Sequence, residues 1–411
     1  MLCQFSFKNF KSYKNETEFD FRAFSTDEFS DSLIKRDKCD DLLPVSVFYG
    51  PNGGGKTAVL QALACLVTTV VRPVHELGKN SIGIVLQQGV AAEPFVFDPA
   101  TANEPTEFQV YFRTDGYEYR YYLSLFHDEV AEESLDRKII GAKRPAHLFD
   151  REGKNIELGA KLSKAGINRN INPKMPFLSF LSINYDIPDI ARAQRWFESC
   201  IIRTYANPAA EQLIMFSSRE EWKTQFLTAL NDMDIDISGF WFSRDEKKIY
   251  LTHRVGEQDY DLSLDQESDG TKKMLSVLPM LLLALNEGRL IVIDELDAKL
   301  HPKLLEYVIK LFKNPTINRH GAQLLFTSHD ISTMKNTVFR RDEIWFAALT
   351  EDRSSEIYTL YDIRGENDER VKSTAAFGKQ YLTGVYGADP YLQNMLGEGW
   401  NRNEFKADQE K

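Results

Sequence analysis

Apolar and polar residues alternate along the first part of the chain. Phe5, Phe7 and Phe10 are separated by polar residues, and a second alternating run follows over residues 16–21. Side chains of a strand point alternately to its two faces, so this pattern predicts a β-hairpin. The continuous apolar run over residues 45–49 predicts a different kind of strand, one that is buried on both faces.

Short alternating runs between residues 79 and 130 predict a set of antiparallel strands. They cover residues 81–86, 95–97, 107–113 and 117–125. Further along the chain, helical spacing and apolar runs predict three helices, which cover residues 189–205, 218–232 and 274–285. No heptad pattern is sustained over three repeats, so we expect no long coiled-coil arm.

Composition narrows the environment in which the chain works. The 411 residues carry a net charge of −11, so the chain has no overall attraction for nucleic acid or for an anionic membrane. Its four cysteines lie far apart without metal-ligand spacing, which predicts free thiols in a reducing cytoplasm. The most apolar run, residues 274–285, is interrupted by Pro279 and is too short to cross a bilayer. We therefore expect a cytoplasmic protein without a membrane partner.

Basic residues gather in one segment, residues 137–174. Its cations are Arg137, Lys138, Lys143, Arg144, Arg151, Lys154, Lys161, Lys164, Arg169 and Lys174. This segment is either a surface that contacts phosphates or a partner, or a solvated loop region. The lack of aromatic residues arranged for base stacking favours the second interpretation, and any contact with nucleic acid has to be local.

The chemistry begins directly after the buried strand at residues 45–49. A glycine, four residues, and then glycine, lysine and a hydroxyl residue form the phosphate-loop pattern, and a helix follows. Glycines let successive backbone N–H groups converge on an anion, the lysine reaches the β- and γ-phosphates, and the hydroxyl holds Mg²⁺. The predicted ATP-binding residues are Gly50, Asn52, Gly53, Gly54, Gly55, Lys56 and Thr57.

A second buried strand, residues 290–293, ends in two carboxylates. Ligands of parallel sheets bind at the carboxyl ends of the strands, so Asp294 and Glu295 are expected beside the phosphate loop. We predict that Asp294 and Thr57 bind Mg²⁺ and that Glu295 is the general base that activates water.

The opening residues 8–13, followed some forty residues later by the phosphate loop, resemble the head of ABC-type ATPases of the SMC/RecF class. In that class the residues that match Lys11 and Ser12 lie close to the nucleotide. From these two residues alone, an edge hairpin with a solvated lysine remains an alternative.

Three further stretches resemble the same class, and they occur in its order. Residues 267–273 resemble the ABC signature, with Ser268 and Gly270 at a helix start, although Ser268 is also an ordinary N-cap residue. Asp297 matches the D-loop, and His329, at the end of another aliphatic strand, matches the switch histidine that senses the γ-phosphate. The glutamine of the class is not placed, and Gln87 and Gln88 are its candidates.

The resemblance implies an α/β fold, an ABC-type phosphate-loop head with a flanking antiparallel sheet and a short inserted helical lobe. The expected divisions are two parts of the head, an inserted mostly helical lobe between them, and a C-terminal helical extension with a charged tail. The two parts of the head cover residues 1–134 and 241–365. The lobe covers residues 135–240, and the extension with its tail covers residues 366–411. In such heads the signature of one subunit completes the phosphate site of another, so ATP is expected between two copies of the chain.

The C-terminal stretch over residues 381–391 resembles that of compact bacterial ABC-type ATPases. Members of this family occur in anti-phage defence and abortive-infection loci, as RloA-like, PARIS-type or Septu-type ATPases, beside a separately encoded nuclease or toxin. The resemblance implies a sensor or regulatory scaffold for such an effector. One alternative is a RecF-like ATPase that acts directly on DNA, which the net charge disfavours. A transporter subunit is a weaker alternative, because the opening hairpin and the middle insertion are foreign to it.

Overall fold

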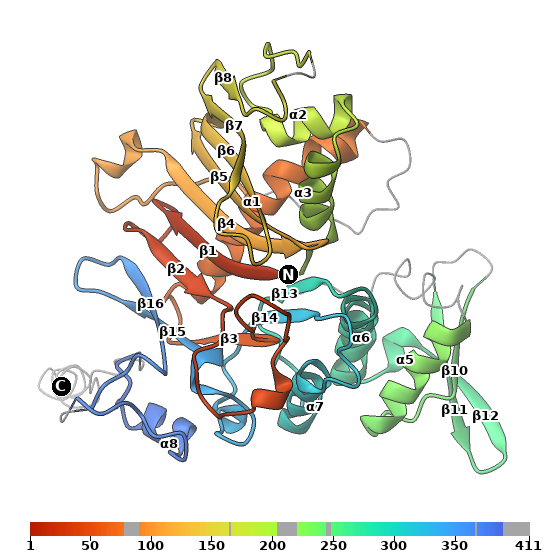
Figure 1. Ribbon diagram of the computed structural model, residues 1–411. Coiled ribbons are helices and arrows are strands. Elements are labelled where there is room, and N and C mark those ends of the chain that lie inside the picture. The colour runs from red at the N-terminus through yellow and green to blue at the C-terminus, as the bar shows by residue number, and fades with distance from the viewer. Residues whose placement is uncertain (78–89, 164–165, 204–219, 244–247, 366–367, 389–411) are drawn as a thin grey trace, which may run out of the picture.

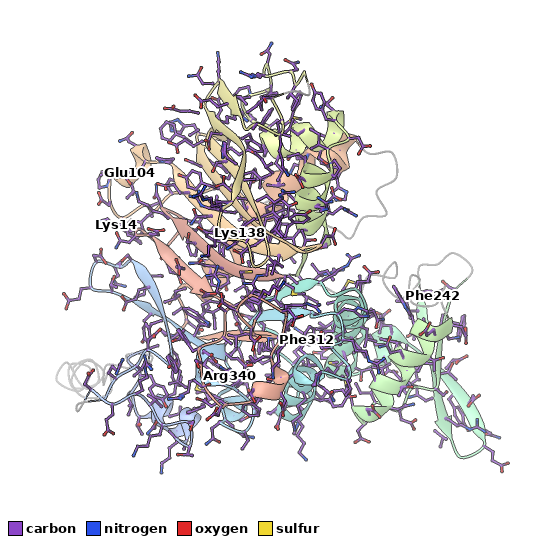
Figure 2. The ribbon with its side chains drawn as sticks, in the orientation of Figure 1. Lys14, Glu104, Lys138, Phe242, Phe312 and Arg340 are labelled. Atoms are coloured by element: carbon purple, nitrogen blue, oxygen red, sulfur yellow. The ribbon has the colours of Figure 1, made fainter. Side chains whose placement is uncertain are left out.

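The structure is a computed structural model, and its description covers most of the chain. The described residues are 1–77, 90–163, 166–203, 220–243, 248–365 and 368–388. Two large sheets lie one above the other in Figure 1, and a small three-stranded sheet lies to one side. Side chains fill the space between the two large sheets, and Phe242 of the small sheet lies away from both (Figure 2).

The upper sheet has seven strands, all antiparallel to their neighbours. In spatial order they are β2 (Thr17–Asp20), β1 (Leu2–Lys8), β4 (Thr106–Thr114), β5 (Tyr117–Phe126), β6 (Glu129–Ile139), β7 (Ala146–Glu152) and β8 (Asn155–Leu158). The predicted opening hairpin is confirmed, because β1 pairs with β2 and places Phe5 opposite Phe19. The strands predicted over residues 107–113 and 117–125 are β4 and β5.

The lower sheet has six strands, five of them parallel and β16 antiparallel at one edge. Their spatial order is β16 (Ser355–Thr359), β15 (Ile344–Leu349), β3 (Val45–Tyr49), β14 (Gln323–Thr327), β13 (Leu290–Ile293) and β9 (Ile201–Arg203). All residues of β3, β13 and β14 are buried, as their uninterrupted apolar runs predict.

Alternate residues of the parallel strands serve two separate cores. Phe48, Val292 and Leu325 face the upper sheet, where they join the helices α1 (Lys56–Leu77), α2 (Phe177–Asn184) and α3 (Pro188–Ser199). Their neighbours in sequence face the opposite side and pack on α5 (Glu220–Asp232), α6 (Asp269–Glu287), α7 (Pro302–Lys313) and α8 (Phe377–Leu382). The parallel sheet is therefore covered on both faces, and α1 lies between the two large sheets.

The small sheet lies beside α5 and consists of three antiparallel strands. They are β10 (Gly239–Phe242), β11 (Ile249–Val255) and β12 (Gln258–Ser263). Short 3₁₀ turns complete the described elements, at Ser30–Ser32, Thr101–Asn103, Leu264–Gln266, Ile331–Thr333 and Arg341–Glu343.

Helix α1 is long and apolar enough to cross a membrane by length and composition, over Lys56–Glu76. Most of this stretch, 61%, is buried inside the protein, where it packs against α2 and α3. The apolar helix predicted over residues 274–285 forms the middle of α6 and is buried in the same way. The apolar side chains of both helices therefore pack within the two cores.

Several predicted elements differ from the structure. The lobe expected to be mostly helical over residues 135–240 begins with strands, because β6, β7 and β8 continue the upper sheet to Leu158. Their charged residues lie mainly on one face while Leu135 and Phe149 pack inward, so the high charge hides the strand pattern. The helix expected over residues 189–205 ends at Ser199, and residues 95–97 form no strand. The strand predicted over residues 81–86 lies outside the described residues.

Candidate nucleotide-binding site

The predicted site lies at the carboxyl ends of three adjacent strands, β3, β14 and β13. The parallel register places Thr327 beside Phe48 and Phe326 beside Ile293, so the loops that follow these strands start at the same edge of the sheet. The phosphate loop follows β3, Asp294 follows β13, and His329 follows β14. This is the edge at which parallel sheets bind ligands.

The phosphate loop has a shape that requires glycine at several of its positions, of which Gly50 and Gly55 are the clearest. Gly50 and Gly55 have φ angles of 143° and 107°, which side chains rarely adopt. A Cβ atom on Gly50 would lie 2.1 Å from the backbone oxygen of Ala347, and one on Gly55 would lie 2.5 Å from Oγ of Ser355. The loop is therefore packed tightly against β15 and β16 on one side.

The tip of the loop faces away from that packing. Asn52 and Gly53 are exposed, and a Cβ atom on Gly53 would contact nothing within 4 Å. Gly54 returns toward β15, because its Cβ position lies 2.7 Å from the backbone oxygen of Ala347. Helix α1 then begins at Lys56, so the start of a long helix adjoins the loop, as anion binding requires.

Lys56 lies back against its own loop. Its Nζ donates hydrogen bonds to the backbone oxygens of Gly50 at 2.8 Å and Pro51 at 3.0 Å. Burial lowers the pKa of Lys56, while the nearby carboxylates of Asp294 and Glu295 oppose this effect. The ammonium group is thus held within the loop and close to the acidic residues that follow β13.

Thr57 and Asp294 meet across the site, as the sequence predicts. Thr57 Oγ1 donates a hydrogen bond to Asp294 Oδ2 at 2.9 Å, and Thr327 Oγ1 donates to Asp294 Oδ1 at 2.6 Å. A hydroxyl and a carboxylate side by side fit Mg²⁺, which usually takes few protein oxygens and completes its shell with water and phosphate. Among the described residues, no group of three or more acidic, His or Cys side chains could hold a metal by itself.

Glu295 is exposed and follows Asp294 in a left-handed backbone conformation, with φ of 49°. Its backbone N–H donates to Thr327 Oγ1 at 2.7 Å, and its backbone oxygen accepts from Lys273 Nζ at 3.2 Å. Thr327 therefore contacts both acidic residues, a role that sequence reasoning missed. The hydroxyl residue at the end of an aliphatic strand was the available signal.

Asp297 and His329 are also brought together. The backbone N–H of His329 donates to Asp297 Oδ2 at 3.0 Å, while Oδ1 of Asp297 is buried and has no hydrogen-bond partner among the described residues. His329 is exposed and lines the same cavity as Asn52 of the phosphate loop. The side of the site on which this cavity lies is its open side.

The turn that contains Lys11 and Ser12 lies beside the phosphate loop. Lys11 Nζ donates to Gln61 Oε1 of α1 at 2.7 Å, and Tyr13 OH donates to the backbone oxygen of Gly55 at 3.3 Å. Ser12 Oγ accepts from Ser355 Oγ at 2.9 Å, next to the position where Gly55 has no room for a side chain. The two residues are thus neighbours of the loop and not merely parts of a distant edge hairpin.

The candidate glutamines Gln87 and Gln88 lie outside the described residues. The chain that follows them lies close to this turn, because the backbone N–H of Lys11 donates to the backbone oxygen of Glu93 at 2.7 Å. The position of a glutamine contact with nucleotide therefore stays a prediction.

Ser268 and Gly270 occupy the N-terminus of α6, as predicted. Ser268 is the N-cap, and its Oγ accepts a hydrogen bond from the backbone N–H of Thr271 at 3.1 Å. The adjacent Asp269 forms an ion pair with Lys299 at 3.0 Å. Within the described part of the chain, neither Ser268 nor Gly270 forms a hydrogen bond or ion pair with residues 50–57. The described hydrogen bonds and ion pairs therefore do not join the signature residues Ser268 and Gly270 to the phosphate loop.

Part of the basic segment is paired within the chain. Arg137 forms an ion pair with Asp189 at 2.6 Å, and Lys138 pairs with Glu118 at 2.9 Å. Arg151 is buried and donates to the backbone oxygen of Met175 at 2.7 Å. These contacts reduce the charge that the segment offers to a phosphate backbone.

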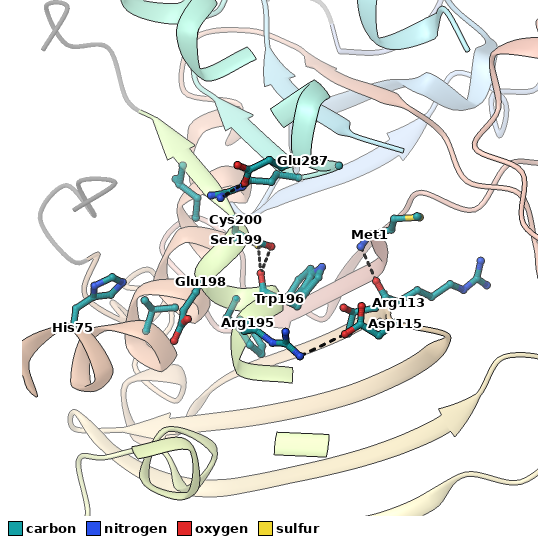
Figure 3. A pocket seen from close by; sticks show the side chains of 16 residues that line it. Met1, His75, Arg113, Asp115, Arg195, Trp196, Glu198, Ser199, Cys200 and Glu287 are labelled. Atoms are coloured by element: carbon teal, nitrogen blue, oxygen red, sulfur yellow. Dashed lines mark hydrogen bonds and ion pairs between the residues drawn. The ribbon is translucent and has the colours of Figure 1, made fainter. Parts of the chain in front are cut away.

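Two cavities differ in their relation to the site. One, with a volume of about 930 Å³, adjoins the phosphate loop and is lined by Asn52, His329 and the C-terminal residues Tyr381 and Leu382. The other, of about 720 Å³, lies between α1, α3 and the turn before β13, and Arg195 pairs with Asp115 at its edge at 3.5 Å (Figure 3). The second cavity contains none of the predicted site residues.

Comparison with known proteins identifies the family of the chain. A search of curated proteins gave no match. A sequence model of one protein family matches residues 45–335, a range that begins at β3 and contains the phosphate loop, Asp294, Glu295 and His329. The match covers more than half of the chain, so the chain belongs to the family described as "AAA domain, putative AbiEii toxin, Type IV TA system".

Proposed function

We propose that the chain is an ATPase that acts as a nucleotide-dependent switch in abortive infection. Family membership supports a phosphate-loop ATPase in that context. The observation that carries the proposal is the cluster at the sheet edge, where Thr57 and Thr327 both donate to the carboxylate of Asp294. Lys56 is held in the adjoining loop, so cation, hydroxyl and carboxylate converge at one place.

The residues divide into binding and catalytic groups. The backbone N–H groups of the loop and Lys56 would bind the phosphates of ATP, and Thr57 with Asp294 would hold Mg²⁺. Bound Mg²⁺ neutralises charge that develops on the phosphates. Glu295 orients and deprotonates the attacking water, and His329 contacts the γ-phosphate from the open side of the site.

We further propose that two copies of the chain share each site. The positive end of the α6 helix dipole lies at its N-terminus and favours an anion there. Among the described residues, Ser268 and Gly270 form no hydrogen bond or ion pair with residues 50–57, so we assign them to the phosphate loop of a second copy. Ser268 and Gly270 of a second copy would then cover the γ-phosphate. ATP would favour the closed dimer, and hydrolysis would release it, because the γ-phosphate contacts exist only in that state.

The biological role follows from the resemblance to compact defence ATPases and from the family description. We propose a cytoplasmic sensor or scaffold that controls a separately encoded nuclease or toxin. All four cysteines are free, in keeping with a reducing compartment. Because the family description also names a toxin, expression of this chain alone is informative: unimpaired growth supports a separate effector, and growth arrest contradicts it.

The ATPase proposal is tested by turnover of two variants. Lys56→Ala should lose both nucleotide binding and hydrolysis, because the cation within the loop is removed. Glu295→Gln should bind ATP as the wild type does and hydrolyse it at least about 100-fold more slowly, on the scale of general acid–base catalysis. Release of phosphate and binding of a fluorescent ATP analogue are the measurements. Wild-type turnover in Glu295→Gln would refute the assignment of the general base.

A further inference from the structure

A buried lysine connects the signature helix to the residue assigned as general base. Lys273 lies in the first turns of α6, five residues after Ser268, and is 6% exposed. Its Nζ donates a hydrogen bond to the backbone oxygen of Glu295 at 3.2 Å. In the proposed dimer, the N-terminus of α6 serves the phosphate site of the other copy, whereas Glu295 serves the phosphate site of its own chain. The hydrogen bond between Lys273 and Glu295 therefore links the two sites.

The surroundings of Lys273 are unusual for a lysine. Burial lowers its pKa to about 7, although the carboxylates of Asp297, Glu295 and Asp294 favour its charged form. Burying a lysine in this way costs stability, and an apolar side chain of similar length would avoid that cost. The neighbouring Lys272 shows the ordinary alternative, because it stays partly exposed and donates to the backbone oxygen of Asp265 at 2.9 Å.

The backbone of Glu295 is fixed at both of its polar atoms. Thr327 holds its N–H, and its carbonyl oxygen accepts both from Lys273 Nζ and from the backbone N–H of Ala298 at 3.1 Å. The residue itself has a φ of 49°. A non-glycine residue in this region persists only where its surroundings hold it. Among these three contacts, the one from Lys273 is the one that ties the backbone of Glu295 to α6.

We propose that Lys273 is a positioning residue that holds Glu295 in its hydrolytic orientation and makes that orientation depend on the place of α6. The proposal rests on the ATPase function proposed above. When the N-terminus of α6 engages a γ-phosphate in the opposite site, Lys273 transmits the shift of the helix to Glu295. Each general base is thereby coupled to the occupancy of the other site.

The test compares three full-length variants. Lys273→Met keeps the length and removes the donor, Lys273→Arg keeps a donor, and Lys272→Met is the matched control on the same helix. We expect Lys273→Met to lower kcat about 10- to 100-fold with KM and ATP affinity changed less than about threefold, as for lost supporting contacts. Lys273→Arg should recover a large part of kcat, and Lys272→Met should match the wild type.

Hydrogen exchange supplies a readout that does not need turnover. Without the Lys273 contact, amides over residues 294–297 should exchange at least several-fold faster, because the hydrogen bond of the Glu295 N–H opens more often. Wild-type kcat and exchange in Lys273→Met would overturn the proposal, and so would equal losses in Lys273→Met and Lys272→Met. A wild-type protein that hydrolyses no ATP would instead refute the proposed function, while the exchange result would still decide whether Lys273 holds Glu295.

Discussion

Replacing Thr327 by valine tests the arrangement of the acidic residues most sharply. Thr327 is completely buried, and its hydroxyl donates to Asp294 and accepts from the backbone N–H of Glu295. Valine has nearly the same shape, so the change removes two hydrogen bonds without opening a cavity. The expected effects are a loss of stability and a loss of turnover.

The size of the stability loss follows from the two bonds. A hydrogen bond to a charged group contributes about 1.5–3 kcal/mol, and a buried N–H left unpaired costs about 1–3 kcal/mol. Asp294 is only partly buried and keeps Thr57 as a second donor, which reduces the first contribution. We therefore expect the free energy of unfolding to fall by roughly 2–3 kcal/mol.

Denaturant unfolding and ATP turnover provide the assays. Thr359→Val is the control, because Thr359 is also buried and its hydroxyl donates to Asp362 at 2.6 Å, outside the predicted site. Both variants should lose stability, but only Thr327→Val should lower kcat, by about 10- to 100-fold. Thr327→Ser should restore kcat. Full turnover in Thr327→Val, or equal kcat in the two valine variants, would refute the reasoning.

Two more predictions concern pH and assembly. The folded-state pKa of Lys273, about 7, lies below its ordinary value of 10.5, so the unfolded chain binds more protons between these values. In denaturant titrations, the free energy of unfolding of the wild type, measured relative to Lys273→Met, should therefore rise from pH 7 to pH 10. A fall over this range would contradict burial as the cause of the lowered pKa. Glu295→Gln should form a stable dimer with ATP and Mg²⁺ in light-scattering measurements, and an unchanged mass would contradict trapping of a closed state.

The core of the site could be predicted because its signals are local. Uninterrupted apolar runs identify β3, β13 and β14, and each is followed at once by residues of distinct chemistry. Since parallel strands end at one edge, the meeting of Thr57 with Asp294 follows from the sequence pattern. The glycine requirement at Gly50 and Gly55 is likewise visible in the motif and has its reason in the packing against Ala347 and Ser355.

The supporting residues could not be predicted because they depend on tertiary register. Thr327 reaches both acidic residues only because β14 lies directly beside β13 with Phe326 opposite Ile293. In the sequence, Lys273 is one of several charged residues at the start of a helix. Only the packing of α6 buries it beside Glu295. The strands β6 to β8 were missed for a related reason, since charged residues on an exposed strand face resemble a solvated loop.

The shared site is tested most directly by mixing two inactive variants. Lys56→Ala lacks a working phosphate loop, and Ser268→Arg blocks the N-terminus of α6, so each alone should hydrolyse no ATP. Random pairing in a two-fold dimer would place one intact site in half of the dimers and restore at most about a quarter of wild-type turnover. The value falls below a quarter to the extent that the inactive second site withholds the coupling through Lys273. Recovery of turnover in the equimolar mixture is the predicted result. A mixture as inactive as its components, in protein that still dimerises, or full activity of Ser268→Arg alone, would contradict a site built from two chains.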